Sequence, residues 1–422
     1  MNKAKQNNKI SKIIGRIIIC IVLVIAVLLG VNTVATVICS NNNMKVAKSF
    51  EKVIYDEQLV PNVGEDGYPE FTTDRPFRIM QLTDIHIGGG WLSAEQDKKA
   101  LNCVASMITE EKPDLVIVTG DVVFPTPNNA GTLNNKTGAK IFAQMMESLG
   151  VYWTVGFGNH DTEVYGYYSR EDIGDYYSSD ELKYCLFEKG PENVDGCGNQ
   201  IINIKNSQGL ITQSLFVFNS HSYTDKFGIN GEYDNIHSNQ IDWYTASINS
   251  LNEANKNTIN NIGENDLPYP ANAYENVKSL AFFHIPLTEY KDAWTTYVEN
   301  GKTNSEELTY YYGTADESEP IVFSGAGEDN LFETMQSLKS TQGIFCGHDH
   351  INNFSIDYKG IRLTYGMSID YLAYKDLDKL GDYRGCTIIN VNPDSSFDCK
   401  NENYYQDKYE PVYEKESVSF VH

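Results

Sequence analysis

The hydrophobic pattern divides the chain into an apolar N-terminal segment and a long body of short, alternating apolar runs. From Ile17 to Val31 every residue is apolar, and the run continues to Cys39 if three polar residues near its end are tolerated. An α-helix of that length can cross the ~30 Å hydrocarbon core of a bilayer. We therefore predict a transmembrane signal anchor over residues 17–39.

Basic residues flank this segment on its N-terminal side only. Residues 1–16 hold no acidic residue, and their basic residues are Lys3, Lys5, Lys9, Lys12 and Arg16. By the positive-inside rule, this segment stays in the cytoplasm and the body is exported, which predicts a single-pass protein of the cell membrane with an extracellular body. A cleaved signal peptide is the alternative, since Thr33-Val34-Ala35 offers small residues for cleavage, and the body would then be secreted.

Three further regions follow the apolar segment. Residues 40–70 are polar and are broken by Pro and Gly, which predicts a stalk between the membrane and the body. Residues 71–400 carry the regular alternation of apolar runs and form the predicted domain. Residues 401–422 are polar and rich in Tyr, which predicts a tail that either packs on the surface or is loose.

Within the domain, runs typical of strands alternate with helical periodicity. The predicted strands are Phe77–Leu82, Leu115–Thr119, Tyr152–Val155, Leu215–Phe218, Leu280–Phe283 and Gly343–Cys346. Predicted helices lie between them, near residues 94–108, 141–149, 241–251 and 331–338. Polar insertions interrupt the pattern at about Thr162–Gln200, Asn252–Asn276 and Lys291–Asn330. This order predicts an α/β domain with mixed sheets at its core.

Composition narrows the classes of function. The formal net charge is −24, and all 57 acidic residues lie beyond residue 40. A body this acidic repels phosphate backbones, which excludes non-specific electrostatic binding of nucleic acid. A content of 41% hydrophobic and 12% aromatic residues excludes disorder for most of the chain.

Residues typical of metal ligands follow five of the predicted strands. The segments are Thr83-Asp84-Ile85-His86, Thr119-Gly120-Asp121, Gly158-Asn159-His160-Asp161, His284 and Gly347-His348-Asp349-His350. In α/β sheets, ligands bind at the carboxyl ends of the strands. Imidazole and carboxylate together suit borderline divalent metals such as Mn, Fe, Zn or Co. In the Asp-x-His segment, an extended backbone would point residues i and i+2 the same way, toward one ion.

These five segments resemble the motif blocks of the calcineurin-like metallophosphoesterase superfamily. The closer resemblance is to its branch of small phosphatases related to purple acid phosphatases. It rests on LAFFHIPLTEY (Leu280–Tyr290), CGHDHINNF (Cys346–Phe354) and YGMSIDYLAY (Tyr365–Tyr374), and it covers about Phe71 to Asn392. The resemblance implies a four-layer sandwich, in which two mixed β-sheets are flanked by helices.

The resemblance also implies roles for the motif residues. One metal would be held by Asp84, His86 and His350, and the other by Asn159, His284 and His348, with Asp121 bridging the two. A hydroxide between two divalent ions would attack phosphorus in line with the leaving oxygen. His160 would assist the leaving group, with Asp161 orienting it. Tyr365, Tyr371 and Arg384, near the last motif, would be either substrate contacts or structural residues.

The implied activity is hydrolysis of small phosphoesters, with phosphomonoesters favoured. A phosphodiesterase or nucleotidase would use the same metals, and a non-catalytic binding protein on this fold is a further alternative. True purple acid phosphatases carry Tyr three residues after the bridging Asp, where this chain has Phe124. We therefore expect a colourless enzyme that uses divalent metals without obligate ferric iron.

Other candidate residues match no motif. Cys185 and Cys197 bracket a polar loop and can form a disulfide outside the cell, although the sequence leaves their pairing open. His221 and His237 are interpreted as structural residues. The sequence does not indicate the oligomeric state.

Overall fold

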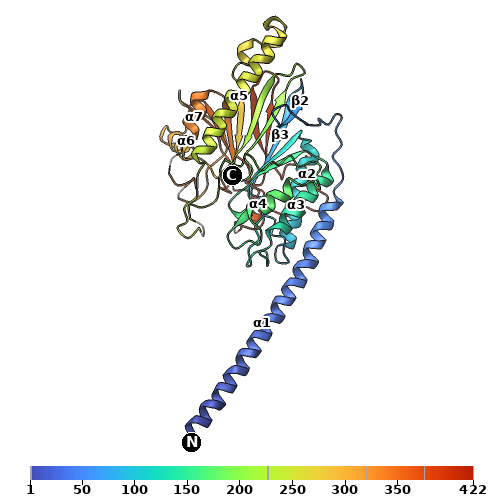
Figure 1. Ribbon diagram of the computed structural model, residues 1–422, viewed down its shortest axis with the longest axis vertical. Helices are drawn as coiled ribbons and strands as arrows, with labels where there is room; N and C mark the ends of the chain where they lie inside the picture. The colour runs from blue at the N-terminus through green and yellow to red at the C-terminus, as the bar shows by residue number, and fades with distance from the viewer. Residues whose placement is uncertain (1, 226–227, 320, 328, 375, 422) are drawn as a thin grey trace.

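Two β-sheets stacked face to face form the centre of the body, and helices cover both outer faces (Figure 1). The structure is a computed structural model that describes residues 2–225, 228–319, 321–327, 329–374 and 376–421. The layers confirm the predicted sandwich of two mixed sheets flanked by helices.

The larger sheet has nine strands in the order β1-β2-β6-β7-β8-β10-β12-β11-β9. Its strands are β1 Asn62–Val63, β2 Pro69–Thr72, β6 Gln200–Lys205, β7 Ile211–Val217, β8 Ser279–Phe282, β10 Thr341–Cys346, β12 Ile361–Tyr365, β11 Ser355–Tyr358 and β9 Leu308–Tyr312. Strands β7, β8, β10 and β12 are parallel to one another, and β2 is parallel to β6. The other pairs in this sheet are antiparallel.

The smaller sheet has five strands in the order β14-β13-β3-β4-β5. These are β14 Phe397–Asn403, β13 Gly385–Val391, β3 Phe77–Leu82, β4 Leu115–Thr119 and β5 Trp153–Gly156. Strands β3, β4 and β5 are parallel, and β13 pairs antiparallel with β3 and β14. The parallel strands of each sheet carry the predicted motif residues at their carboxyl ends.

The helices lie outside the sheets. They are α1 Asn2–Ser49, α2 Ala94–Glu111, α3 Asn135–Leu149, α4 Arg170–Tyr177, α5 Ser238–Ile262, α6 Thr288–Glu299 and α7 Leu331–Leu338. Short 3₁₀ turns occur at η1 His160–Thr162, η2 Glu264–Asp266, η3 Ala271–Ala273 and η4 Leu377–Lys379. Helices α2 and α3 cover the five-stranded sheet, and α5, α6 and α7 cover the nine-stranded sheet.

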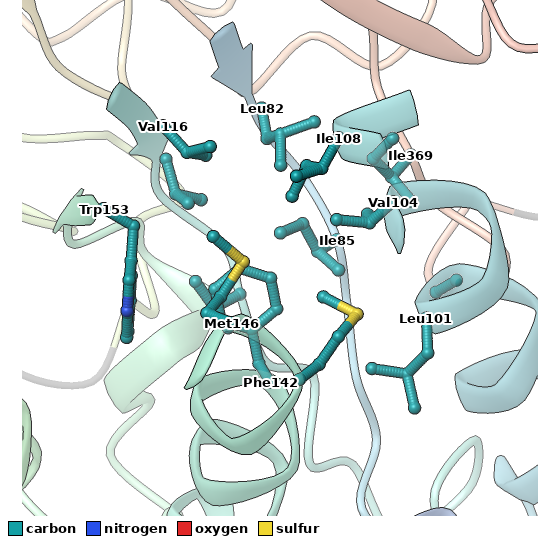
Figure 2. Packing of buried hydrophobic residues seen from close by; sticks show 14 of the residues in the cluster. Leu82, Ile85, Leu101, Val104, Ile108, Val116, Phe142, Met146, Trp153 and Ile369 are labelled. Atoms are coloured by element: carbon teal, nitrogen blue, oxygen red, sulfur yellow. The ribbon is translucent and has the colours of Figure 1, made fainter. Parts of the chain in front are cut away.

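The alternation of side chains along β3 and β4 produces two hydrophobic cores. Ile79 and Ile117 face the other sheet, whereas Met80 and Val116 face α2 and α3. Figure 2 shows the second core, where side chains of α2 and α3 meet those of the parallel strands. Strands buried on both faces require continuous apolar runs, which explains the sequence of Leu115–Thr119.

The predicted stalk, residues 40–70, differs from the structure. Helix α1 runs without interruption to Ser49, and one of its faces packs on α3 and α2. Further along, β1 and β2 join the edge of the nine-stranded sheet. The Pro and Gly residues mark turns between these pieces, and the segment is held on the body because Ala47, Phe50 and Val53 are buried.

The predicted tail also differs in part. Strand β14 extends to Asn403, and Tyr404 and Tyr409 beyond it are almost fully buried. The hydroxyl of Tyr409 donates a hydrogen bond to Glu111 Oε1 at 2.8 Å. Of the two predicted alternatives, the tail therefore packs on the body, and its buried tyrosines hold it against α2.

Trp153 tests the packing between α3 and the five-stranded sheet. Its ring is fully buried and meets Phe142 and Tyr177 edge-on, with centroids 5.5 Å away in each case. We expect Trp153→Ala to lower the free energy of unfolding by about 3–5 kcal/mol, because it leaves a large cavity. Trp153→Phe should cost much less, since the indole N–H has no hydrogen-bond partner in the described residues. Urea unfolding followed by circular dichroism measures both, and equal losses would contradict this account.

Candidate metal centre

The carboxyl ends of the parallel strands of both sheets meet at one edge of the sandwich. The backbone N–H of Asp84 donates to Gly120 O at 3.2 Å, and that of His86 donates to Asp121 O at 3.0 Å. In the other sheet, Gly347 N–H donates to His284 O at 3.1 Å. These bonds place the motif residues of β3 beside those of β4, and the motif residues of β8 beside those of β10. The backbone N–H of His348 joins the two sets, because it donates to Asp84 Oδ2 at 3.2 Å.

The backbone at this edge adopts the left-handed conformation, which residues other than glycine rarely take. Asp84, His86, Asp121 and His348 have φ values of 52°, 55°, 53° and 77°. The expectation of an extended Asp-x-His segment is therefore wrong, because two left-handed residues, and not strand alternation, turn both side chains inward. Such strain is typical of functional sites.

Glycines let the loops approach one another closely. A Cβ atom on Gly158 would lie 2.1 Å from Asp121 Oδ1, and one on Gly347 would lie 1.9 Å from Thr83 Oγ1. Any larger residue at either position would push the loops apart.

The first group of predicted ligands, Asp84, His86 and His350, is buried and compact. Asp84 Oδ1 lies 3.4 Å from His350 Nε2. The rings of His86 and His350 are tilted by 53° to each other, with centroids 4.9 Å apart. One ligand atom from each of the three lies within 4.8 Å of the others, close enough to hold one metal ion.

The second group lies directly beside the first. His284 Nε2 is 3.2 Å from Asn159 Oδ1 and 3.3 Å from His348 Nδ1. Asp121 Oδ2 lies between the groups, 3.3 Å from His86 Nε2 and 3.1 Å from His284 Nε2. The structure therefore brings all seven predicted ligands together, with Asp121 in the central position.

The donor set fits divalent cations. Asp84, His86, Asp121, Asn159 and His284 are each at most 1% exposed. Asp84 Oδ1 has no hydrogen-bond partner in the part of the chain that the structure describes. A buried carboxylate oxygen without a donor is costly unless a cation balances it. Carboxylate, amide and imidazole donors suit Mn, Fe, Zn or Co.

Asp370 is a site residue that the sequence interpretation missed. Its Oδ1 lies 3.1 Å from His86 Nδ1, and its Oδ2 lies 3.1 Å from His350 Nδ1. Burial opposes its ionisation, but the two imidazoles hold the pKa of Asp370 well below its usual range. A carboxylate behind a ligating imidazole fixes the ring so that the opposite nitrogen faces the metal. Asp370 lies within the YGMSIDYLAY segment, directly before Tyr371.

Asp161 does not contact the ring of His160, and its predicted role as orienting partner is corrected. Its carboxylate accepts hydrogen bonds from the backbone N–H groups of Asp121, Val123 and Gly158, at 2.8–3.1 Å. Burial and the nearby Asp121 raise the pKa of Asp161 to about 6. Asp161 therefore ties the loop after β4 to the loop after β5.

Glu163 occupies the orienting position instead. Its Oε1 lies 2.9 Å from His160 Nδ1 and accepts a hydrogen bond from the Tyr223 hydroxyl at 2.9 Å. That hydroxyl in turn accepts from Asn159 Nδ2 at 3.1 Å. The η1 turn brings residues three apart onto one side, a spacing that could have indicated Glu163 from the sequence. Tyr223 carries no such signal.

The three tentative substrate contacts lie in the packed interior. The hydroxyl of Tyr365 donates to Asp349 Oδ2 at 2.6 Å, and that of Tyr371 donates to Glu416 Oε1 at 2.6 Å. Arg384 is 2% exposed and donates to the carbonyl of Asp370 at 2.7 Å. These contacts support the structural interpretation, in which the three residues hold the segment that carries Asp370.

A cavity of about 470 Å³ opens beside Asn159. Loop 162–169 and the loop after β7 supply most of its lining, including Glu163, Tyr168 and Tyr223. Arg170 also lines it, but its guanidinium donates to Asn219, Ser222 and the Gly158 carbonyl. Part of the first polar insertion thus forms a wall of this cavity.

His221 and Asp234 line this cavity, and together with His237 they form a cluster whose ligand atoms lie within 4.8 Å of one another. Their rings are stacked, with centroids 3.9 Å apart and planes 14° apart. Parallel rings cannot both direct a nitrogen lone pair at one ion. His237 Nδ1 also lies 2.8 Å from Asp195 Oδ2, and Nε2 lies 3.3 Å from Asp234 Oδ2.

The eight cysteines, including Cys185 and Cys197, are free thiols.

The fold and the clustered ligands define a metal-dependent hydrolase of phosphoric esters. Residues 77–352 match the model of the calcineurin-like phosphoesterase family, which is more than half of the chain. The chain belongs to the calcineurin-like phosphoesterase family, as the resemblance of its motifs implied.

Individual relatives agree with this assignment. The chain is 28% identical over 327 residues to probable inactive purple acid phosphatase 14 of Arabidopsis thaliana, covering 72% of this chain and 73% of that protein. It is 27% identical to phosphatase DCR2 of Saccharomyces cerevisiae, covering 68% of this chain and 46% of that protein. A dimetal phosphatase from Danio rerio aligns with a TM-score of 0.45 and 11% identity, covering 79% of this chain and 98% of that one. A likeness that low adds nothing to the assignment.

Asp370→Asn tests how much the metal centre depends on the orientation of its imidazoles. We expect metal affinity to fall by about 10- to 100-fold, because one of the two oxygens facing His86 and His350 is replaced by an amide group. Titration of the metal-free protein with Mn²⁺ or Zn²⁺ measures the affinity. Asp357→Asn, in β11 beside the turn to β12, is the matched control. Equal affinities of both variants would show that Asp370 does not orient the ligands.

Proposed function

We propose that this protein is a dimetal phosphomonoesterase in which Asp84, His86 and His350 bind one divalent ion and Asn159, His284 and His348 bind the other. The observation that carries the proposal is the position of Asp121 Oδ2, within 3.3 Å of an imidazole nitrogen from each group. A carboxylate oxygen shared in this way supports a bridging role. Two divalent ions held there would neutralise charge on the phosphoryl oxygens and activate a water molecule for attack.

The chain's own residues would handle the leaving group. His160 is partly exposed, with 28% of its side chain accessible, and its backbone N–H donates to Asp121 Oδ1 at 2.8 Å. This bond fixes the histidine next to the central carboxylate. Glu163 faces Nδ1 of the ring, so a proton on Nδ1 would be held there and Nε2 would face the substrate oxygen. A protonated His160 ring would carry a second proton on Nε2, which it would donate to, or share in a hydrogen bond with, the departing alkoxide.

The hydrogen bonds around Glu163 connect the candidate metal ligand Asn159 with His160. Asn159 Nδ2 donates to Tyr223, and this leaves the amide oxygen of Asn159 free to face the metal. The same tyrosine donates to Glu163, which holds His160. One chain of hydrogen bonds would therefore position both a metal ligand and the leaving-group histidine.

We also propose that α1 anchors the enzyme in the membrane, with residues 1–16 in the cytoplasm and the catalytic domain outside. The helix has the length and composition to span a bilayer, and none of its most apolar stretch is buried in the protein. Secretion after signal cleavage is the alternative. The molecular mass of the mature chain distinguishes them, since cleavage after Ala35 would remove the basic segment and the apolar run.

A panel of phosphoesters with added Mn, Fe, Zn or Co tests the function. We expect monoesters to be hydrolysed faster than diesters or nucleotides, and about two metal ions to be found per chain. His160→Ala should keep its metals and lose about 10²- to 10⁴-fold in turnover. Preferred hydrolysis of diesters would favour the phosphodiesterase alternative. Absence of hydrolysis with any metal would favour a binding protein, in line with the word inactive in the names of several relatives.

Glu163→Gln gives a separate test of how His160 is held. Its activity should fall most for alkyl phosphates, whose leaving oxygen needs a proton, and least for p-nitrophenyl phosphate, whose leaving group is already stable. A purely structural role of Glu163 would lower both rates equally. Plotting the rate against the pKa of the leaving alcohol for the wild type and Glu163→Gln shows which holds.

The colour of the purified enzyme tests the metal chemistry. Phe124 packs on His86 and His160, with ring centroids 5.3 and 4.8 Å away, so the position that could carry a phenolate is a hydrocarbon ring. We expect no visible charge-transfer band after loading with iron in air. Phe124→Tyr supplies the missing phenol and is the matched comparison. A purple wild-type preparation would contradict the absence of a phenolate ligand.

A further inference from the structure

Helix α1 is fastened to the catalytic body from Asn32 onward. Asn32 Nδ2 donates to Gly131 O at 3.0 Å, and Trp91 Nε1 donates to Asn32 Oδ1 at 2.6 Å. Three turns later, Asn43 Nδ2 donates to the carbonyl of Ala94 and to Asp97 Oδ2. The body is therefore held directly at the end of the apolar segment, without a flexible stalk between them.

The free part of the apolar segment is short for a bilayer. Arg16 marks its basic end, because a guanidinium at hydrocarbon depth is costly. From Ile17 to Val31 the helix rises by only about 22 Å, at 1.5 Å per residue, whereas the hydrocarbon core is ~30 Å thick. On the face of α1 turned away from the body, Val34, Val37 and Ile38 remain 52–60% exposed. Lipid must therefore extend past Asn32, alongside the part of the body that Asn32 contacts.

Exposed aromatic and aliphatic side chains gather on that part of the body. Trp91 and Leu92 are 42% and 40% exposed, next to Asn32, and Tyr167 is 68% exposed. Tyr167 N–H donates to Leu133 O at 3.0 Å, which joins its loop to the segment after Gly131. The interfacial patch comprises Trp91, Leu92, Val164, Tyr165 and Tyr167. Figure 1 shows α1 leaving the body beside α2 and α3, on the side where loops lie below α3 and α4.

The same patch borders the cavity beside the metal ligand candidate Asn159. Loop 162–168 carries Val164, Tyr165 and Tyr167 on its exposed side, and its residues Glu163, Val164 and Gly166 line the cavity beside Asn159. Trp and Tyr are the residues that proteins place at the level of lipid headgroups. The strongly acidic body would be repelled by anionic surfaces, so contact with a bilayer has to come from these uncharged side chains.

We propose that the interfacial patch rests on the membrane in which α1 is anchored, and that the metal centre therefore acts on phosphomonoesters carried by membrane lipids. This substrate class rests on the proposed phosphatase function, whereas the docking of the body does not. The cavity then takes up a phosphorylated headgroup at the membrane surface, without the lipid having to leave the bilayer.

Hydrolysis rates for two substrates test the substrate class. The full-length chain is reconstituted in phosphatidylcholine vesicles that contain a minor fraction of hexadecyl phosphate, and p-nitrophenyl phosphate is the soluble substrate. We expect Leu92→Asp/Tyr167→Asp to lower the ratio of lipid to soluble activity by about tenfold or more, with the soluble rate unchanged. Tyr269→Asp, 37% exposed beyond the far end of α5, is the matched control and should leave the ratio unchanged.

Fluorescence quenching tests the docking independently of catalysis. Tyr167→Trp adds an indole to the patch, and its additional emission should be quenched by brominated phosphatidylcholine, whereas that of Tyr269→Trp should not. Equal quenching at both positions, or an unchanged activity ratio in the double variant, overturns the proposal. A dimer that Tyr167→Asp converts to a monomer in sedimentation would also overturn it, because a second copy would then cover the patch. If the wild type hydrolyses neither substrate, the phosphatase function fails while the quenching result still decides the docking.

Discussion

The structure depends on the burial of one carboxylate, that of Asp121, at the edge where the two sheets meet. A fully buried carboxylate is stable only where donors and positive charge surround it. Its Oδ2 faces imidazoles from both sheets, its Oδ1 accepts from His160 N–H, and its own backbone N–H donates to Asp161. Since His86 follows β3 and His284 follows β8, the two sheets have to align at this edge for the charge to be satisfied.

The same requirement explains the strained backbone around the site. Asp84, His86, Asp121 and His348 adopt positive φ values, and each such residue costs about 1–3 kcal/mol. The apolar strands behind them, such as Leu115–Thr119, are fully buried and rigid, so the packed core can hold the loops in these conformations. Metal binding would offset this conformational cost further, because the strained loops bring carboxylates and imidazoles together in one small volume.

Residues behind the candidate metal ligands hold those ligands in place and connect them with the neighbouring loops. Asp370 holds two imidazoles and is itself held by backbone N–H groups of residues 372–374, at 2.6–2.7 Å. On the other side, Tyr223 and Glu163 connect Asn159 with His160. Loop 162–168 continues from Glu163 to the exposed aromatic patch near α1. The proposed leaving-group chemistry and the proposed membrane-facing surface therefore lie on one continuous segment.

Much of this could be predicted from the sequence. Continuous apolar runs and helical periodicity indicated the main strands and helices, because burial on both faces of a sheet requires them, and the motif segments after the strands indicated the family and the seven candidate ligands. The apolar segment after Arg16 indicated a membrane helix by length and composition alone. Each of these features depends on residues close together in the chain, so a short stretch of sequence is enough to predict it.

Only the tertiary structure decided which residues support the ligands. Asp161 and Glu163 both lie within three residues of His160, and the folded η1 turn decides between them: Glu163 faces the ring, and Asp161 accepts from three backbone N–H groups. Asp370 and Tyr223 reach the site across long stretches of sequence, and Tyr365, Tyr371 and Arg384 face the interior. The docking of α1 on the body likewise depends on single side chains such as Asn32. Contacts between residues far apart in the chain leave no periodic pattern in the sequence, so they become visible only in the folded structure.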